Sequence, residues 1–120
     1  MSEGRNVFCA GVAVAAPTNW KYYDTVYTER YMRTPAENAA GYATNPIQRA
    51  NALHGDLLLI HGTADDNVHP ENSLEFAAAL QGAGKFCDMM VFTNQNHSIK
   101  TCDMRRVVYG RMLDYFNRNL

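Results

Sequence analysis

Residues Leu57–Pro70 read LLLIHGTADDNVHP, four aliphatic residues followed at once by histidines, two adjacent carboxylates and an amide. A short run that is apolar throughout, rather than at alternate positions, is typical of a parallel strand covered on both faces. The polar residues then fall at the carboxyl end of the strand, where ligands bind in open parallel sheets. This stretch therefore predicts an α/β protein with a candidate site directly after Ile60.

Two further runs have the same continuous apolar character, VFCAGVAVAA at Val7–Ala16 and CDMMVF at Cys87–Phe92. Pro70 suits the first position of a helix that Gly82 and Gly84 end, and Asp103 can cap a last helix. The positions expected to face the core are Leu74, Ala77, Ala78 and Leu80 in the first helix and Met104, Val108, Met112, Tyr115 and Phe116 in the second. Alternating strands and helices predict about three parallel strands with flanking helices and right-handed crossovers.

The composition is that of one small globular domain. The 120 residues are 47% hydrophobic, and eleven basic residues nearly balance twelve acidic ones to give a net charge of −1. Basic residues are scattered rather than interleaved with aromatics along a stripe, which argues against a nucleic-acid partner. No apolar run approaches the ~20 residues of a membrane helix, so no membrane segment is expected in this chain.

Metal and disulfide sites are not expected. Cys9, Cys87 and Cys102 are odd in number and lack C-x-x-C spacing, so all three are interpreted as packing thiols. The histidines near the acids, His61 and His69 among them, lack the H-x-x-x-H or H-E-x-x-H spacing of a metal site. We therefore expect no cofactor, and we interpret His61 and His69 as structural.

Residues 17–56 differ from a plain crossover between strands. They hold three prolines and a group of aromatic side chains, and they predict one or two short helices wrapped in loop. Excursions of this length in compact domains are usually functional or disordered, and this one is too aromatic for disorder. We therefore expect it to contribute to a site.

Two polar loops follow consecutive predicted strands, His61–Pro70 and Thr93–Lys100. Because consecutive parallel strands are often neighbours, an acid from the first loop could meet His97 from the second. An acid that orients an imidazole is the acid–base part of a catalytic triad. The alternative is that His97 is an ordinary surface histidine and that the adjacent aspartates cap the following helix.

A nucleophile for such a triad is missing from the sequence. α/β hydrolases carry a serine in G-x-S-x-G between a strand and a helix. The serines of this chain are Ser2, Ser73 and Ser98, none of which lies in that motif, and Cys9 would have to leave a buried strand. The acid and the base are therefore present without their partner.

Three stretches resemble a known family: WKYYDTVYTERYM (Trp20–Met32), LLLIHGTADDNVH (Leu57–His69) and NQNHSI (Asn94–Ile99). They are similar to the C-terminal part of the catalytic domain in the dipeptidyl peptidase IV group of the prolyl oligopeptidase family of serine peptidases. The resemblance covers nearly the whole chain and favours bacterial members. It implies that residues 1–120 are the C-terminal portion of an α/β-hydrolase domain, without the nucleophile-bearing part and the propeller.

The resemblance also implies residue roles. Asp65 would be the triad acid, His97 the base, and Asn67 a contact for the carbonyl and N-terminal part of the substrate. The residues that match the apolar walls of a proline pocket are Trp20, Tyr23, Tyr27 and Val68. Asp66 would tune or cap the loop.

The implied activity is release of N-terminal dipeptides with proline or alanine second, through an acyl-enzyme. The implied parent acts on peptides, forms a homodimer and is exported. In the family the nucleophile serine, the oxyanion tyrosine and the acids that bind the substrate amine precede the matched region. The alternative is therefore an inactive fragment or interaction remnant, whose strand Val7–Ala16 exposes an edge that pairs with other chains.

Overall fold

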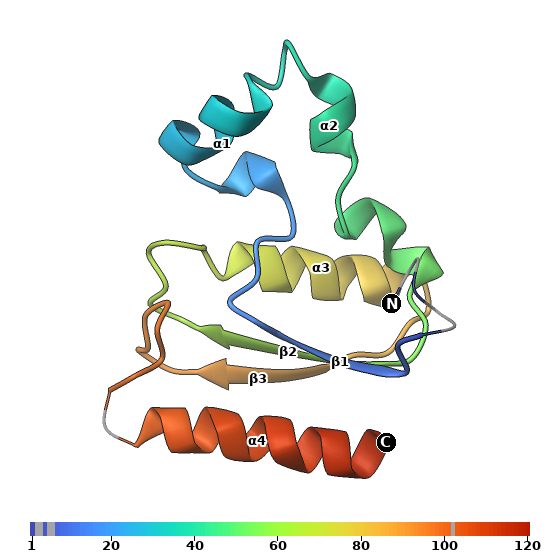
Figure 1. The fold of residues 1–120 in the computed structure, drawn as a ribbon, viewed down its shortest axis with the longest axis vertical. Coiled ribbons are helices and arrows are strands. Elements are labelled where there is room, and N and C mark those ends of the chain that lie inside the picture. The colour runs from blue at the N-terminus through green and yellow to red at the C-terminus, as the bar shows by residue number, and fades with distance from the viewer. Residues whose placement is uncertain (2–3, 5–6, 102) are drawn as a thin grey trace.

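The computed structural model describes residues 1, 4, 7–101 and 103–120, which form a parallel sheet between two layers of helix (Figure 1). The sheet has the order β1-β2-β3, with strands β1 (Ala10–Val14), β2 (Asp56–Gly62) and β3 (Asp88–Phe92). Helix α3 (Glu71–Gly82) covers one face, and α4 (Met104–Asn119) covers the other. The predicted architecture of three parallel strands with flanking helices is confirmed.

The segment between β1 and β2 folds into short helices. They are η1 (Trp20–Tyr22), α1 (Thr25–Met32), α2 (Ala39–Ala43) and η2 (Ile47–Ala52). Figure 1 shows α1 and α2 on the α3 side of the molecule, farther from the sheet than α3 itself. The long excursion is therefore ordered, as its aromatic content indicated.

Strand β2 forms the centre of the core. Successive side chains of a strand point to opposite faces. Leu57 and Leu59 accordingly pack with α3, while Leu58 and Ile60 pack with α4. Each buried aliphatic side chain contributes about 1.5–3 kcal/mol. The run LLLI is apolar throughout because both faces of this strand are covered by a helix.

The edge strands are shorter and less buried than the sequence indicated. β1 begins at Ala10 rather than Val7, and Val7 is 76% exposed. β1 also ends before Ala15, which has a φ of +47°. Within the described part of the chain, β1 and β3 each have one neighbouring strand, so their side chains are mostly half-buried. The prediction of equally buried strands was wrong for these two.

The other strand boundaries shift by one or two residues. β2 begins one residue early, at Asp56, and continues through His61 to Gly62, beyond the predicted Ile60. β3 begins at Asp88 rather than Cys87. His61 was not expected in a strand because it is polar, but its ring is buried and fully hydrogen-bonded.

Helix α3 buries Ala77 and Leu80 as its apolar pattern predicted, but the rest of its buried face differs from the prediction. It begins at Glu71, with Pro70 as the preceding cap residue, one position later than predicted. Leu74 is 54% exposed and Ala78 is exposed, so their predicted core positions were wrong. The buried residues are Asn72, Ser73, Phe76, Ala77 and Leu80. Asn72 and Ser73 are buried in place of apolar residues because each has hydrogen-bond partners outside the helix, such as Thr18 for Asn72 and His61 for Ser73.

Helix α4 packs as its pattern predicted. Val108 and Tyr115 are buried, Met104 and Met112 pack beside them, and Phe116 is half-buried. Asp103 occupies the cap position, but its side chain makes no capping hydrogen bond. Its carboxylate instead faces the Arg106 guanidinium at 3.9 Å.

No helix in the described ranges is long and apolar enough to cross a membrane.

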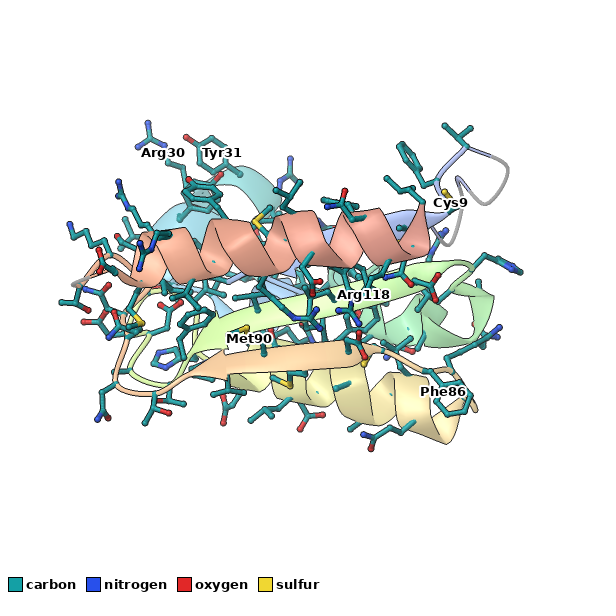
Figure 2. All side chains as sticks on the ribbon, turned by 90° about the horizontal axis from the view of Figure 1, so that it is seen from below. Cys9, Arg30, Tyr31, Phe86, Met90 and Arg118 are labelled. Carbon is teal, nitrogen blue, oxygen red and sulfur yellow. The ribbon has the colours of Figure 1, made fainter. Side chains whose placement is uncertain are left out.

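The cysteines are not uniformly packed, which corrects the sequence interpretation. Cys9 is exposed near the start of β1 (Figure 2), and Cys87 is half-buried before β3. Cys102 lies outside the described residues. Cys9 is exposed because β1 starts only after it.

Iodoacetamide should alkylate Cys9 before Cys87. Burial, with a smaller contribution from the Asp88 carboxylate, raises the pKa of the Cys87 thiol. The thiolate is the reactive form, so Cys87 reacts more slowly at mildly alkaline pH. Peptide mass mapping over a time course measures both sites, and Asp88→Asn should accelerate only Cys87. Faster labelling of Cys87 than of Cys9 in the unmodified chain would contradict this expectation.

Candidate active site

Asp65 and His97 lie together at the carboxyl end of the sheet. The loops after β2 and β3 lie at the same end of the molecule (Figure 1). His97 Nδ1 is 2.9 Å from Asp65 Oδ2. Because a carboxylate only accepts, Nδ1 carries the hydrogen and donates it, which leaves Nε2 as the basic nitrogen. The Asp65 side chain is fully buried, whereas the His97 side chain is 40% exposed, so the imidazole can reach a substrate or nucleophile.

The carboxylate of Asp65 is held by donors on both oxygens. Oδ1 accepts the backbone N–H groups of Asn67 and Val68, each at 3.0 Å. Oδ2 faces a second imidazole nitrogen, Nε2 of His61, at 3.3 Å, in addition to His97. These bonds offset the cost of burying the carboxylate and fix the direction in which Oδ2 points.

His61 is buried and bonded through both ring nitrogens. Nε2 lies 2.8 Å from the carbonyl oxygen of Val68, and Nδ1 lies 2.7 Å from the hydroxyl of Ser73. A carbonyl only accepts, so Nε2 carries the hydrogen and Nδ1 accepts from Ser73. Ser73, His61 and Asp65 thus form a serine–histidine–aspartate series of contacts like that of a triad, but all three residues are buried. Ser73 is therefore unsuited to act as a nucleophile.

The two loops are hydrogen-bonded to each other. The N–H of Ala64 donates to the carbonyl oxygen of Gln95 at 3.0 Å, and the N–H of Asn94 donates to Thr63 Oγ1 at 2.8 Å. Gly62 lies so close that a Cβ there would be 2.2 Å from the same Gln95 oxygen. The absence of a side chain at Gly62 therefore allows the loop with His97 to approach the loop with Asp65.

An aromatic cluster formed by Trp20, Tyr23 and Tyr27 lies in the segment between β1 and β2. Trp20 stacks on Tyr27 at 6.2 Å between centroids, and Tyr23 meets Tyr27 edge-on at 5.4 Å. Tyr31 extends the cluster at 4.9 Å from Tyr27, with Arg30 beside it (Figure 2). Three of the predicted pocket residues are therefore in contact with one another.

A hydrogen bond joins this cluster to the loop of the acid. The hydroxyl of Tyr23 donates to Asn67 Oδ1 at 2.9 Å, so the Asn67 amide presents its NH₂ group as the remaining donor. Val68, the fourth predicted pocket residue, follows in the chain and is buried. Asn67 thus lies between the aromatic cluster and Asp65.

Asn72, which the sequence pattern did not single out, anchors the start of the aromatic segment. Asn72 is fully buried, and its Oδ1 accepts the N–H of Thr18 at 2.9 Å. Thr18 Oγ1 donates to the carbonyl oxygen of Asn72 at 2.6 Å, and Asn72 Nδ2 donates to that of His69 at 3.1 Å. Asn72 and Ser73 could have been recognised from the sequence, because they are two adjacent polar residues in the first helical turn after the loop that carries Asp65.

The remaining candidates lie at the surface or outside the described residues. Ser98 and Asp66 are exposed, and Ser2 belongs to the part that is not described. Within residues 1, 4, 7–101 and 103–120, no group of three or more histidine, cysteine or acidic side chains is arranged to hold a metal ion.

The whole of this chain matches one family model. Residues 1–120 match the model described as the prolyl oligopeptidase family. The chain belongs to this family. Its relatives include "Probable dipeptidyl-aminopeptidase B" of Ajellomyces dermatitidis, 44% identical over 94% of this chain, and dipeptidyl aminopeptidase B of Saccharomyces cerevisiae, 42% identical over 97%. The chain spans 13% and 14% of these relatives' lengths, respectively.

A solved structure shows the same fold. The crystal structure of Porphyromonas gingivalis dipeptidyl peptidase 4 superposes on this chain with a TM-score of 0.96 and 43% sequence identity. The match covers 99% of this chain and 17% of that chain. The family resemblance and the predicted α/β-hydrolase fold are therefore confirmed. This prolyl oligopeptidase family chain corresponds to the C-terminal catalytic region of such enzymes.

Proposed function

We propose that this chain is the acid- and histidine-bearing part of a serine-type dipeptidyl peptidase, and that residues 1–120 form part of its catalytic domain. The observation that carries the proposal is the 2.9 Å bond between His97 Nδ1 and Asp65 Oδ2 in a member of this peptidase family. The buried carboxylate and the exposed imidazole have the environments that a triad acid and base require.

In the proposed mechanism, a serine from outside these 120 residues attacks the scissile carbonyl while His97 Nε2 takes its proton. His97 then gives this proton to the leaving amine as the acyl-enzyme forms. Water attacks the acyl-enzyme, with Nε2 again accepting a proton and returning it to the serine. Asp65 holds the tautomer throughout and stabilises the imidazolium in each step.

The proposed substrates are peptides with proline or alanine second. Rigid aromatic faces can enclose a flat pyrrolidine ring with few rotamers to immobilise, and the proposal is supported by the mutual contacts of Trp20, Tyr23 and Tyr27. Val68 would close the pocket from the loop of the acid. Asn67 would donate its NH₂ group to the substrate carbonyl.

Tyr23→Phe should raise KM for a glycyl-prolyl anilide about fivefold in the full-length enzyme, with kcat little changed. The hydroxyl holds Asn67 Oδ1 at 2.9 Å. Loss of one hydrogen bond costs about 1 kcal/mol, which corresponds to a factor of about five. Tyr31→Phe is the matched control, because this exposed ring lies at the outer end of the cluster. An unchanged KM in Tyr23→Phe would contradict the role given to Asn67.

The 120-residue chain by itself should not hydrolyse a glycyl-prolyl amide. Its sequence lacks G-x-S-x-G, and an enzyme without one triad member retains only residual catalysis. Activity should return when the chain is mixed with a separately prepared segment that supplies this motif, and His97→Ala should abolish it. If the chain alone hydrolysed the amide and His97→Ala abolished that hydrolysis, the conclusion that this chain lacks the nucleophile would be wrong.

The alternative, an inactive fragment that binds other chains, is favoured by the edge of β1. In the described part β1 pairs only with β2, and an apolar groove of about 320 Å³ lies beside it, lined in part by Val14, Val108 and Met112. Unpaired edges favour association between chains. Light scattering should then show oligomers, with no gain of activity in the mixing experiment. A homodimeric, exported parent of bacterial origin stays a prediction of the resemblance.

A further inference from the structure

His61 is a buried ionisable side chain that the proposed mechanism does not use. Its ring is 1% exposed, yet both nitrogens are bonded. Nε2 faces two acceptors, the Val68 carbonyl oxygen at 2.8 Å and Asp65 Oδ2 at 3.3 Å. Nδ1 accepts from Ser73 in the first turn of α3 at 2.7 Å. The His61 ring therefore contacts the Asp65 carboxylate, the loop that contains Val68, and helix α3.

We propose that His61 is a positioning residue that makes the acid and the substrate-binding loop one rigid unit. The proposal rests on the function proposed above. The Nε2–H group holds the Asp65 carboxylate and the Val68 carbonyl at the same time. The bond from Ser73 sets the plane of the ring, so that this hydrogen points at both acceptors.

The geometry distinguishes this role from filling of the core. An apolar side chain of equal volume would leave the Val68 carbonyl oxygen, the Ser73 hydroxyl and one direction of Asp65 Oδ2 without their donor or acceptor. The N–H of Val68 already donates to Asp65 Oδ1. With its carbonyl bound to His61, the backbone of Val68 is fixed on both sides, and Asn67 lies inside the same closed ring of bonds.

Two kinetic parameters should therefore change together when His61 loses its Nε2 donor. Rotation of the Asp65 carboxylate misdirects His97 and lowers kcat. Movement of Val68 and Asn67 loosens the proposed substrate contacts and raises KM. A purely structural histidine would instead reduce the number of active molecules, with kcat per active site and KM unchanged.

The test compares His61→Asn with His61→Gln in the full-length enzyme. The glutamine side chain places an amide nitrogen close to the position of Nε2, whereas asparagine reaches only the position of Nδ1. His61→Asn should lower kcat at least about tenfold and raise KM, since a displacement of ~1 Å at a catalytic group costs up to ~10²-fold. His61→Gln should restore most of both. The assay uses a glycyl-prolyl anilide, with active sites counted by a fluorophosphonate.

Wild-type values of kcat per active site and KM in His61→Asn would overturn the proposal, as would equal losses in the two variants. If His61→Asn does not fold, Ser73→Ala replaces it. That variant keeps the ring and removes its partner at Nδ1, so kcat should fall and KM should rise by smaller factors. Unchanged kinetics in Ser73→Ala would then overturn the proposal.

His97→Ala separates this proposal from the one on which it rests. If wild-type enzyme does not cleave the anilide, or if His97→Ala cleaves it equally well, the proposed function fails and this inference fails with it. If His97→Ala is inactive while His61→Asn retains full kinetics, only the positioning role of His61 is wrong.

Discussion

Asp65→Asn should lower kcat of the full-length enzyme by about 10⁴, with a small effect on KM, because the histidine then adopts the wrong tautomer. The surrounding bonds determine how the new amide sits. The N–H groups of Asn67 and Val68 both point at Oδ1, so they require an oxygen there. The NH₂ group must then occupy the position of Oδ2 and donate to His97 Nδ1. His97 would carry its hydrogen on Nε2, where it cannot accept the proton of a serine.

Asp66→Asn is the matched control for this substitution. The two aspartates are adjacent, but Asp66 is exposed whereas Asp65 is buried. The control should keep wild-type kcat and KM on a glycyl-prolyl anilide, and circular dichroism should show that both variants are folded. A kcat close to wild type in Asp65→Asn, or an equal loss in both variants, would contradict the assignment of Asp65 as the acid.

The sequence predicted the central strand well because its signal is local. A short run of aliphatic residues followed at once by a polar loop is typical of a parallel strand covered on both faces. The edge strands were predicted less well, since Val7 and Phe8 continue the apolar run of β1 but are mostly exposed. Composition alone does not tell where pairing with β2 begins.

Topology predicted that an acid of the loop after β2 could meet His97 of the loop after β3, and the family resemblance identified that acid as Asp65. The supporting bonds did not follow. His61, Asn72 and Ser73 are polar residues with partners in other elements, and the apolar pattern of α3 assigned Leu74 to the core instead. Such side chains are buried because specific donors and acceptors meet in the folded chain, which residue type does not reveal.

Gly62→Ala should damage both the stability and the activity of the enzyme. The new Cβ would lie 2.2 Å from the carbonyl oxygen of Gln95 and 2.8 Å from its carbonyl carbon. These are backbone atoms, so no rotamer change relieves the clash and the loop must move. Overpacking of this kind costs about 1–3 kcal/mol of unfolding free energy. The displaced loop carries His97 two residues later, and a shift of ~1 Å there should lower kcat by about 10².

Two other glycines separate the two effects. Gly55 has a φ of +80°, and a Cβ there would lie 2.1 Å from the carbonyl oxygen of Cys9, at the end of β2 opposite to Asp65. Gly55→Ala should lower the melting temperature while folded molecules keep their kcat. Gly110 is exposed in α4 with open space around it, so Gly110→Ala should stabilise the protein by about 0.5–1 kcal/mol without changing kcat.

Thermal unfolding and kcat per active site, measured for all three variants, test this assignment. If Gly62→Ala loses activity only in proportion to its loss of folded protein, as Gly55→Ala should, then the close approach at Gly62 serves stability alone. A specific loss of kcat in Gly62→Ala, beyond that of Gly55→Ala, shows that this contact sets the distance between the two loops. A Cβ at Gly62 would push the Gln95 backbone away, and this displacement would lengthen the 3.0 Å hydrogen bond from the Ala64 N–H to the Gln95 carbonyl oxygen that joins the two loops.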